Sequence, residues 1–577
     1  MNPDRTFPSP DALRRLPFGP LDLAVFAVIL IGLLLLLEVG RGATVSFAPT
    51  QVTTISTDPA NLPYYAARSL LRMFVALGFS VLFTLGYGYL AARSRRAEKI
   101  LVPALDILQS VPVLGFLSVT VTAFIALFPG SLLGLECASI FAIFTAQAWN
   151  MTFSFYHSVR ALPRELDEVS RSLRLTRWQR FWKIEVPNSM VGLVWNGMMS
   201  FGGGWFFLAA SEAISVLNRH YALPGIGSYV ATAVDHGEMG KVGLGIATMV
   251  VMILAVNVFF WRPLTAWAER FKLEESAAAE QQGSLVLNLL RRTSWPRLLG
   301  AARRPVTERV GRLMRVLGRD GTAPLSVPAR QTRRGDLIFG VLVGVPLAYG
   351  LYRLIAYVGA DGYGVLPEAF GLGAITFGRV CVLLVIGTVI WVPVGVWIGL
   401  NPRVARLAQP IVQVLASFPA NFLFPFATLA FIKTGLSLNV GGILLMSLGA
   451  QWYILFNTIA GAMAIPTDLR EAADVAGLHG WNRWRRLIIP GIFPAYVTGG
   501  ITASGGAWNA SIVAEVVTYG GTTLTASGLG AFIAGAAEDG DFHKILAGVM
   551  VMSIYVVGLN RLFWRRLYGL AETRYSL

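Results

Sequence analysis

Long apolar runs recur along the whole chain and constrain its fold more than any other feature. A helix of about 20 apolar residues crosses a hydrocarbon core roughly 30 Å thick. Six such runs precede residue 265 and six follow residue 335. Hydrophobic residues make up 55% of the 577 positions and charged residues 14%, a balance unusual for a soluble protein of this length. The predicted spans are 21–40, 64–92, 103–128, 132–156, 188–215, 240–262, 337–357, 376–400, 408–432, 439–463, 491–518 and 543–566. The sequence therefore predicts an all-α polytopic membrane protein with about 12 transmembrane (TM) helices.

Basic residues lie in the segments between these runs and indicate how the chain is oriented. Lys and Arg concentrate at the N-terminus, at 93–99, at 160–183 and throughout 262–334. Because cytoplasmic loops are enriched in Lys and Arg, we expect both termini in the cytoplasm. The net charge of +16 is spread over these loops, so it indicates orientation among membrane lipids, and no nucleic-acid partner is expected. No small-residue cleavage site follows the first run, so we expect an uncleaved span.

The second half of the chain repeats the first at a nearly fixed register. Adding 307, and later 303, to a residue number relates Arg72 to Arg379, Ser110 to Ser417, Trp149 to Trp452, Trp205 to Trp508 and Glu212 to Glu515. The change in register falls where a short external loop over 128–136 is expected. Each copy has an even number of spans, so both have the same orientation, and a pathway is expected along a pseudo-two-fold axis normal to the membrane.

This duplication predicts four segments. An N-terminal cytoplasmic tail, first span and external loop occupy 1–62, and the first membrane domain occupies 63–265. A basic cytoplasmic linker covers 266–335, with an amphipathic helix expected over 284–290. The second membrane domain covers 336–571.

The most specific motif lies in the basic cytoplasmic loop of the second half. It begins at Glu471, Ala472 and Ala473, continues to Gly477 and closes at Pro490. Glu and Ala favour a helix, and glycine can end one in the left-handed conformation. Proline is tolerated at the start of the next span, where its missing N–H is harmless. The loop resembles the E-A-A-x(3)-G-x(9)-I-x-L-P segment of permease subunits of bacterial ATP-binding-cassette (ABC) importers, a short helix that docks in a groove of the cytoplasmic ATPase.

The equivalent loop of the first half is diverged. It keeps Glu168 and Pro187 but has Ser170 and Arg174 where the second half has Ala and Gly. An ordinary amphipathic loop is the alternative reading. Because the motif occurs twice in register, we favour a pair of coupling helices, the first of them degenerate.

The whole chain resembles the duplicated permease component of anion ABC importers in the nitrate, sulfonate and taurine branch. The residues that carry the likeness are Pro103 to Pro112, Ala210 to Ala213 and Leu223 to Gly227. The resemblance implies two tandem six-helix type I importer domains in a bacterial inner membrane. It also implies two ABC ATPase subunits and an extracytoplasmic solute-binding protein, for which the external loops 221–238 and 522–541 are the natural surface. Fused ferric-iron permeases are the alternative within this class.

No phosphate-binding loop of the G-x(4)-G-K-[ST] type occurs in the sequence. ATP and Mg²⁺ are therefore expected in partner ATPase subunits, and no cofactor, catalytic residue or metal ligand is assigned to this chain. Cys137 and Cys381 lie in apolar runs without metal-like spacing and are expected to pack in the core. A secondary transporter would need acidic or His groups at mid-membrane, and a membrane-bound enzyme would need clustered His, Asp or Cys, so both classes are less favoured.

Charged residues inside spans are costly and usually face a partner or an aqueous cavity. Arg72 and Arg379 on the second span of each half, with Glu212 and Glu515 on the fifth, are expected in the outer third of the membrane. We expect each Arg to pair with a Glu of its own or the opposite half, and the two Arg to attract an anion. Alternatively the Arg reach the interface and the Glu cap a helix turn.

Aromatic and small residues one to two turns before these Glu suggest a gate at the pseudo-dyad. The gate residues predicted are Trp205, Phe206, Trp508 and Asn509. Ser110 and Ser417, each two residues before a proline, are predicted to line the pathway, because proline frees a backbone carbonyl that needs a polar neighbour. Packing against lipid and local backbone hydrogen bonds are the alternatives.

Overall fold

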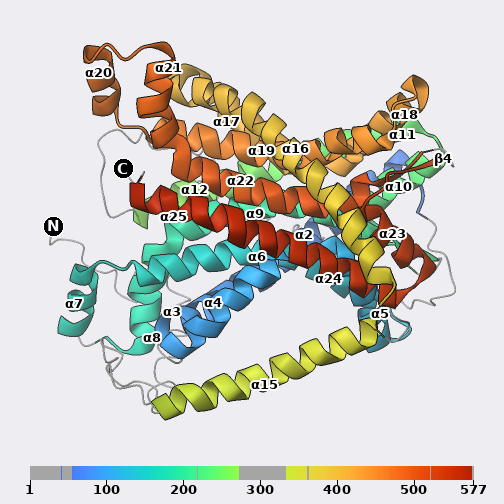
Figure 1. The fold of residues 1–577 in the computed structure, drawn as a ribbon, viewed down its shortest axis with the longest axis horizontal. Coiled ribbons are helices and arrows are strands. Elements are labelled where there is room, and N and C mark those ends of the chain that lie inside the picture. The colour runs from blue at the N-terminus through green and yellow to red at the C-terminus, as the bar shows by residue number, and fades with distance from the viewer. Residues whose placement is uncertain are drawn as a thin grey trace, which may run out of the picture. The chain divides into compact units, whose positions relative to one another are not determined.

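A computed structural model describes residues 40–41, 55–173, 175–216, 219–271, 309, 333–359, 363–519 and 522–574. Nearly all of them are helical (Figure 1). The predicted span 21–40 and the amphipathic helix at 284–290 lie outside the described residues, apart from residue 40.

The chain forms two compact units that do not coincide with the two repeats. One unit holds residues 1–42, 153–196 and 255–331, and the other holds 43–152, 197–254 and 332–577. The second unit therefore contains membrane helices of both halves. Every cavity and every inter-half contact described below lies within this second unit.

The helices of the first half follow the predicted order. Their bounds are η3 Pro59–Asn61, α2 Leu62–Phe83, η4 Thr84–Gly88, α3 Tyr89–Arg93, α4 Arg95–Ser110, η5 Val113–Phe116, α5 Leu117–Leu127, α6 Leu133–Arg160, α7 Arg164–Ser172, α8 Arg177–Arg180, η6 Phe181–Glu185, α9 Val186–Glu212, α10 Ile226–Asp235, α11 Met239–Val256, η7 Asn257–Trp261, α12 Arg262–Ala268 and η8 Glu269–Phe271. An antiparallel hairpin of β1 Ala213–Val216 and β2 Arg219–Ala222 follows α9, with Ala213 opposite Ala222.

The second half repeats this plan, and helix α15 precedes the repeated part. Its elements are α15 Arg333–Val358, α16 Val365–Leu400, α17 Pro402–Ser417, η9 Ala420–Leu423, α18 Phe424–Thr434, α19 Leu438–Ala464, α20 Thr467–Val475, α21 Gly480–Arg483, η10 Trp484–Ile488, α22 Ile489–Ala514, β3 Val516–Tyr519, β4 Thr522–Thr525, α23 Leu529–Asp539, α24 Phe542–Leu559, η11 Asn560–Trp564 and α25 Arg565–Arg574. Among the described elements, helix α19 packs most extensively, with α22 on one side and α16 on the other (Figure 1). Small residues permit this packing, since a methyl group at Gly399 would lie 2.7 Å from the Ile459 carbonyl oxygen.

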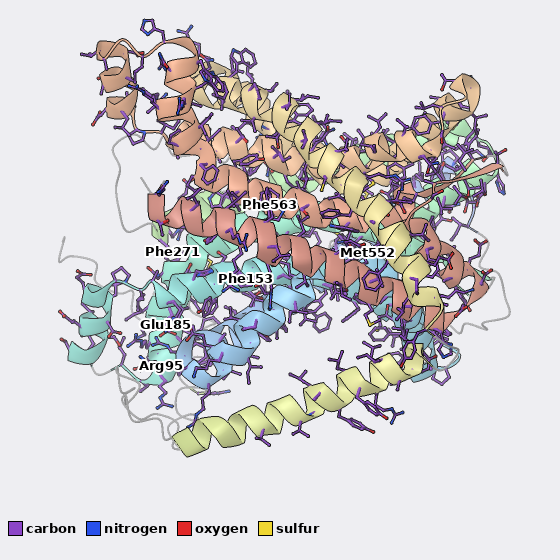
Figure 2. The ribbon with its side chains drawn as sticks, in the orientation of Figure 1. Arg95, Phe153, Glu185, Phe271, Met552 and Phe563 are labelled. Carbon is purple, nitrogen blue, oxygen red and sulfur yellow. The ribbon has the colours of Figure 1, made fainter. Side chains whose placement is uncertain are left out.

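The described residues fill every predicted span after the first. Six helices are long and apolar enough to cross a membrane, or up to eight if each of two bent pairs counts as one span. Helices α6, α9 and α15 are also longer than about 20 residues. Met552 on α24 and Phe563 on its continuation η11 are labelled in Figure 2; the first is buried and the second is half exposed.

The spans predicted at 103–128 and 408–432 are not single straight helices. Each is a bent pair of helices, and the angle between the halves of the second pair is 81°. Pro112 and Pro419 lie at the bends with extended ψ values of 115° and 105°. The residue before a proline is also kept out of the helical region, so Val111 and Phe418 are extended and the helix must stop there.

The predictions of external loops at 221–238 and 522–541 are also wrong. Each segment begins in the second strand of a hairpin and continues as helix α10 or α23. In α10 the residues Ile226, Tyr229, Val230 and Ala233 are buried, which is a helical stripe of apolar side chains. The spans predicted to reach 215 and 518 end at Glu212 and Ala514, because the next residues form strands.

Three prolines near the ends of spans follow π turns. Pro187, Pro263 and Pro490 each stand two residues after the last residue of η6, η7 or η10. A proline ring clashes with the carbonyl four residues earlier, and here that carbonyl belongs to the π turn, where the wider spacing relieves the clash. Pro490 is an early residue of α22 as predicted, but α22 continues directly from η10.

Candidate translocation path and coupling helices

Glu212 ends α9 and is completely buried, and it joins three helices of the first half. Its Oε1 accepts hydrogen bonds from Arg72 Nη1 and Ser69 Oγ of α2, each at 2.6 Å. Its Oε2 accepts from the Gly227 N–H, also at 2.6 Å. Gly227 lies in the first turn of α10, where exposed N–H groups favour a negative charge. The carboxylate therefore fixes the start of α10 against α2 and α9.

Glycines make room for this carboxylate. A methyl group at Gly225 would overlap the Glu212 carboxylate, and one at Gly227 would lie 2.7 Å from the Ala209 carbonyl oxygen. The same holds in the second half, where a methyl group at Gly528 would overlap the Glu515 carboxylate. The glycines of the Leu-Pro-Gly-Ile-Gly segment are thus required for space.

The second half builds the same junction. Arg379 Nη1 lies 2.7 Å from Glu515 Oε1, which also accepts from Thr376 Oγ1 at 2.8 Å. Glu515 Oε2 accepts from the Ala531 N–H of α23 at 3.1 Å. Arg379 Nη2 donates to Asn439 Oδ1 at 2.8 Å. Each Arg therefore pairs with the Glu of its own half, which is the first of the two arrangements expected.

Two charged residues that sequence reasoning missed enlarge the junction of the first half. Glu136 accepts from Arg72 Nε at 2.6 Å and from Nη2 at 2.7 Å, and it also pairs with Arg68. In the second half Asn439 takes the place of Glu136, and the position equivalent to Arg68 is Ile375. Both charges of this second pair are therefore missing together. An Arg inside a span and a Glu at the start of another were the available signals.

Burial of the two arginines gives no support to their predicted role in attracting an anion. Arg72 is 1% exposed and Arg379 is 6% exposed, and both are hydrogen-bonded to carboxylates. Neither lines the two cavities described next. Their geometry is that of ties between helices.

A cavity lies between α9 of the first half and α22 and α19 of the second. Its volume is about 40 Å³, and one water molecule needs roughly 10 to 15 Å³, so the cavity has room for a few waters. The lining residues on α9 and α22 are largely equivalent positions in the two repeats: Gly203 and Gly506, Phe206 and Asn509, and Phe207 and Ala510. The remaining lining comes from α19 and from the bend between α17 and η9, both in the second half. The cavity thus lies beside the pseudo-dyad and is closed to anything larger than a few waters.

Of the four residues predicted to form a gate, two line this cavity and the two tryptophans do not. Phe206 and Asn509 line the cavity, whereas Trp205 and Trp508 are buried in the helix packing. Trp205 lies edge-on to Phe201, and Trp508 stacks on the ring of Tyr555.

A second cavity adjoins the first. It is lined by Met198, Met199, Gly202, Gln413, Ala416, Ser417, Tyr453 and Phe456. Ser417, predicted to line the pathway, thus lines this cavity, and a methyl group at Gly202 would lie 2.7 Å from its Oγ. The side chain of Ser110 lies outside the described residues.

The motif of the second half forms the short helix α20 as predicted. Glu471 and Ala472 are exposed, while Ala473 is buried. Gly477 has φ +66°, the left-handed conformation that ends the helix. Val475 is 90% exposed, which leaves an apolar side chain open to a partner.

The equivalent helix of the first half, α7, is held differently. Arg180 is buried and pairs with Asp167 of α7 and, at 2.9 Å, with Glu185. In the second half the equivalent Arg483 pairs with Asp474 at 2.6 Å in an exposed position. Ser170 is buried like its counterpart Ala473. Glu168 of α7 is exposed, Pro187 lies in α9, and Arg174 lies outside the described residues.

A duplicated bundle of membrane helices, with a cavity beside the pseudo-dyad and a short exposed helix in each half, defines a membrane transport permease. Residues 84–265 and 391–575, more than half of the chain, match the family described as binding-protein-dependent transport system inner membrane component, and the chain belongs to this family.

Relatives of the chain are single permease proteins, each similar to part of it. The nitrate import permease protein NrtB of Leptolyngbya laminosa is 26% identical over 286 residues, 44% of this chain and 97% of that protein. The bicarbonate transport system permease protein CmpB of Synechococcus elongatus is 27% identical over 209 residues, 36% of this chain and 72% of that protein.

Proposed function

We propose that the chain forms the whole translocation path of an ABC importer that carries a small anion. The observation that carries this proposal is the double match to the permease family, together with relatives named for nitrate and bicarbonate. The cavity supports it, because its lining combines equivalent positions of both halves. The chain is the transport permease, and ATP hydrolysis belongs to separate subunits.

The same comparison supports a set of partners for the chain. Two ABC ATPases dock on α7 and α20, whose exposed apolar residues Val169, Leu173 and Val475 offer contact area on the cytoplasmic side. ATP and Mg²⁺ bind in those subunits. A solute-binding protein meets the outer surface formed by the hairpins and by α10 and α23. Both termini of the chain lie in the cytoplasm.

Reconstitution tests this proposal. The chain is co-expressed with the ATPases encoded beside it, purified and placed in liposomes with a candidate binding protein. ATP hydrolysis and solute accumulation are then measured with nitrate, bicarbonate and taurine, and with ferric iron for the competing permease class. We expect at least one anion to stimulate hydrolysis and to accumulate, and ferric iron to do neither. Stimulation by ferric iron alone, or failure of any ATPase to co-purify, would contradict the proposal.

A further inference from the structure

Tyr453 of α19 lies where the two cavities meet. It is one of three residues, with Gly202 and Ala416, that line both of them. The first cavity continues toward Phe206 and Phe207 on α9, and the second toward Met198 and Met199, nearer the start of that helix. The tyrosine therefore stands between an outer and an inner part of the same interface.

The tyrosine ring is inserted between equivalent glycines of the two halves. A methyl group at Gly203 would lie 3.0 Å from the Tyr453 hydroxyl oxygen, and one at Gly506 would lie 3.5 Å from ring carbon Cε2. Gly203 and Gly506 are related by the 303-residue register. Since equivalent positions flank the pseudo-dyad, one side chain occupies the axis at this level.

The repeat has no second tyrosine to match it. The position equivalent to Tyr453 is Asn150, next to the matched pair Trp149 and Trp452. The cavity position occupied by Phe206 in the first half is Asn509 in the second. Aromatic and amide side chains have thus been exchanged reciprocally between the halves.

Asn509 adds a polar contact across the halves at the same level. Its Oδ1 accepts the Val113 N–H at 2.9 Å, at the bend of the first half's broken span. The Tyr453 hydroxyl makes no hydrogen bond to any residue that the structure describes, although its backbone carbonyl accepts from Asn457. Because the hydroxyl has no such partner, the ring can move out of the cavity wall without breaking a hydrogen bond within the protein.

We propose that Tyr453 alone is the barrier that closes the path between the two cavities, a reading that rests on the proposed function only in taking these cavities as the path. Phe206 and Asn509 form the wall above it, and Gly203 and Gly506 are the seats for its ring. The second half supplies the barrier, and the first half supplies only a seat.

A passive leak assay tests the barrier without ATPase, binding protein or knowledge of the solute. The chain is placed alone in liposomes loaded with potassium nitrate, and nitrate efflux is followed with valinomycin present to balance charge. Tyr453→Ala should raise efflux by about tenfold or more, since it opens a closed constriction. Tyr453→Phe keeps the ring and should stay tight. Asn150→Ala, the equivalent position, is the matched control and should also stay tight.

The seat is tested with a second pair of variants. Gly203→Ala places a methyl group against the tyrosine hydroxyl, so it should displace the ring and raise the leak, and adding Tyr453→Phe should restore tightness. Gly505→Ala is the matched control, because a methyl group there meets nothing within 4 Å. Each variant is compared by size-exclusion profile and thermal stability. If Tyr453→Ala does not assemble, Tyr453→Leu is measured in its place.

Two results would overturn the barrier assignment. One is a Tyr453→Ala or Tyr453→Leu protein as tight as the wild type, and the other is an equal leak in Asn150→Ala. Because nitrate here is only a small permeating probe, a leak in Tyr453→Ala with no ATP-driven anion import would sustain the barrier while sinking the proposed solute class.

Discussion

Buried charges at the outer junctions are balanced within each half. The first half holds two cations, Arg68 and Arg72, against Glu136 and Glu212, all at most 3% exposed. The second half holds only the pair formed by Arg379 and its Glu. Removing one partner of a buried ion pair leaves an uncompensated charge, which costs several kcal/mol, whereas losing both together can be neutral. This explains why the second half lacks both members of one pair.

The second half thus supplies the control for a double-mutant cycle in the first. Arg68→Ile and Glu136→Asn introduce the residues found at the equivalent positions, Ile375 and Asn439. We expect each single substitution to destabilise by about 3 kcal/mol, since it strands a buried charge. The double variant should recover most of that loss. Thermal unfolding in detergent measures all four proteins, and a strictly additive double variant would contradict the balance.

Residues that both halves retain were within reach of the sequence, and residues that differ were not. The pairing of Arg72 with Glu212 could be predicted because the repeat keeps both. Glu136 and Tyr453 escaped because the other half has Asn at each position, so a search for identities passes over them. Trp205 and Trp508 were predicted to form the gate because both repeats have Trp at this position. Both side chains are instead buried in the helix packing.

The coupling helices differ in what ties them and what they expose. On α20 the tie between Arg483 and Asp474 is exposed, and surface ion pairs contribute little. On α7 the tie runs through buried Arg180. The most exposed apolar side chains are Val475 on α20 and Leu173, which follows α7. Each helix therefore presents a different surface to its ATPase.

Charge placed on these open side chains should disrupt docking without unfolding the protein. Val475 is 90% exposed and Leu173 is 65% exposed, so Val475→Asp and Leu173→Asp remove no core contact. We expect each to reduce ATPase co-purification and solute-stimulated hydrolysis by about tenfold, since a buried unpaired charge at an interface costs more than 1.4 kcal/mol. Thr573→Asp, on an exposed position of α25 outside both coupling helices, is the control and should dock like the wild type. Wild-type docking in both Asp variants would contradict the assignment.

Asp541 gives the N-terminus of α24 a pH-dependent cap. Its carboxylate accepts the Lys544 N–H at 3.0 Å, and this hydrogen bond holds the pKa of Asp541 below its ordinary 3.8. The stabilisation is therefore present above 3.8 and is lost as pH falls through the lower folded-state pKa. We expect Asp541→Ala to cost up to about 1 kcal/mol locally, less with solvent screening. Hydrogen exchange of 542–545 should show the change, and Asp541→Asn should remove its pH dependence.

Element order and most spans were predictable, but the breaks between them were not. Apolar length fixes where a span lies, and Arg and Lys fix its direction. The bends at Pro112 and Pro419 follow from the restriction that a proline places on the residue before it. A count of apolar residues does not take this restriction into account. The sequence predicts loops at α10 and α23 because these segments contain glycines and acidic residues. These residues obscure the helical spacing of the apolar side chains that are buried.

The molecule as a whole keeps its repeat in the outer junctions and abandons it along the path. The cavity walls on α9 and α22 are equivalent positions, yet the rest of the lining comes from the second half. The compact unit that contains the path draws on both repeats, whereas the other contains the first coupling helix. Duplication therefore accounts for the helical framework, and divergence of the second half accounts for the rest of the cavity lining.

The exchange of Tyr453 and Asn150 makes the two halves mutually dependent. Two copies of the second half would bring two tyrosines to one axis, and two copies of the first would bring none. Neither half could rebuild this interior by self-association. If the two halves were separate proteins, the cell would need both in equal amounts. Fusion fixes this ratio and also keeps the two halves together.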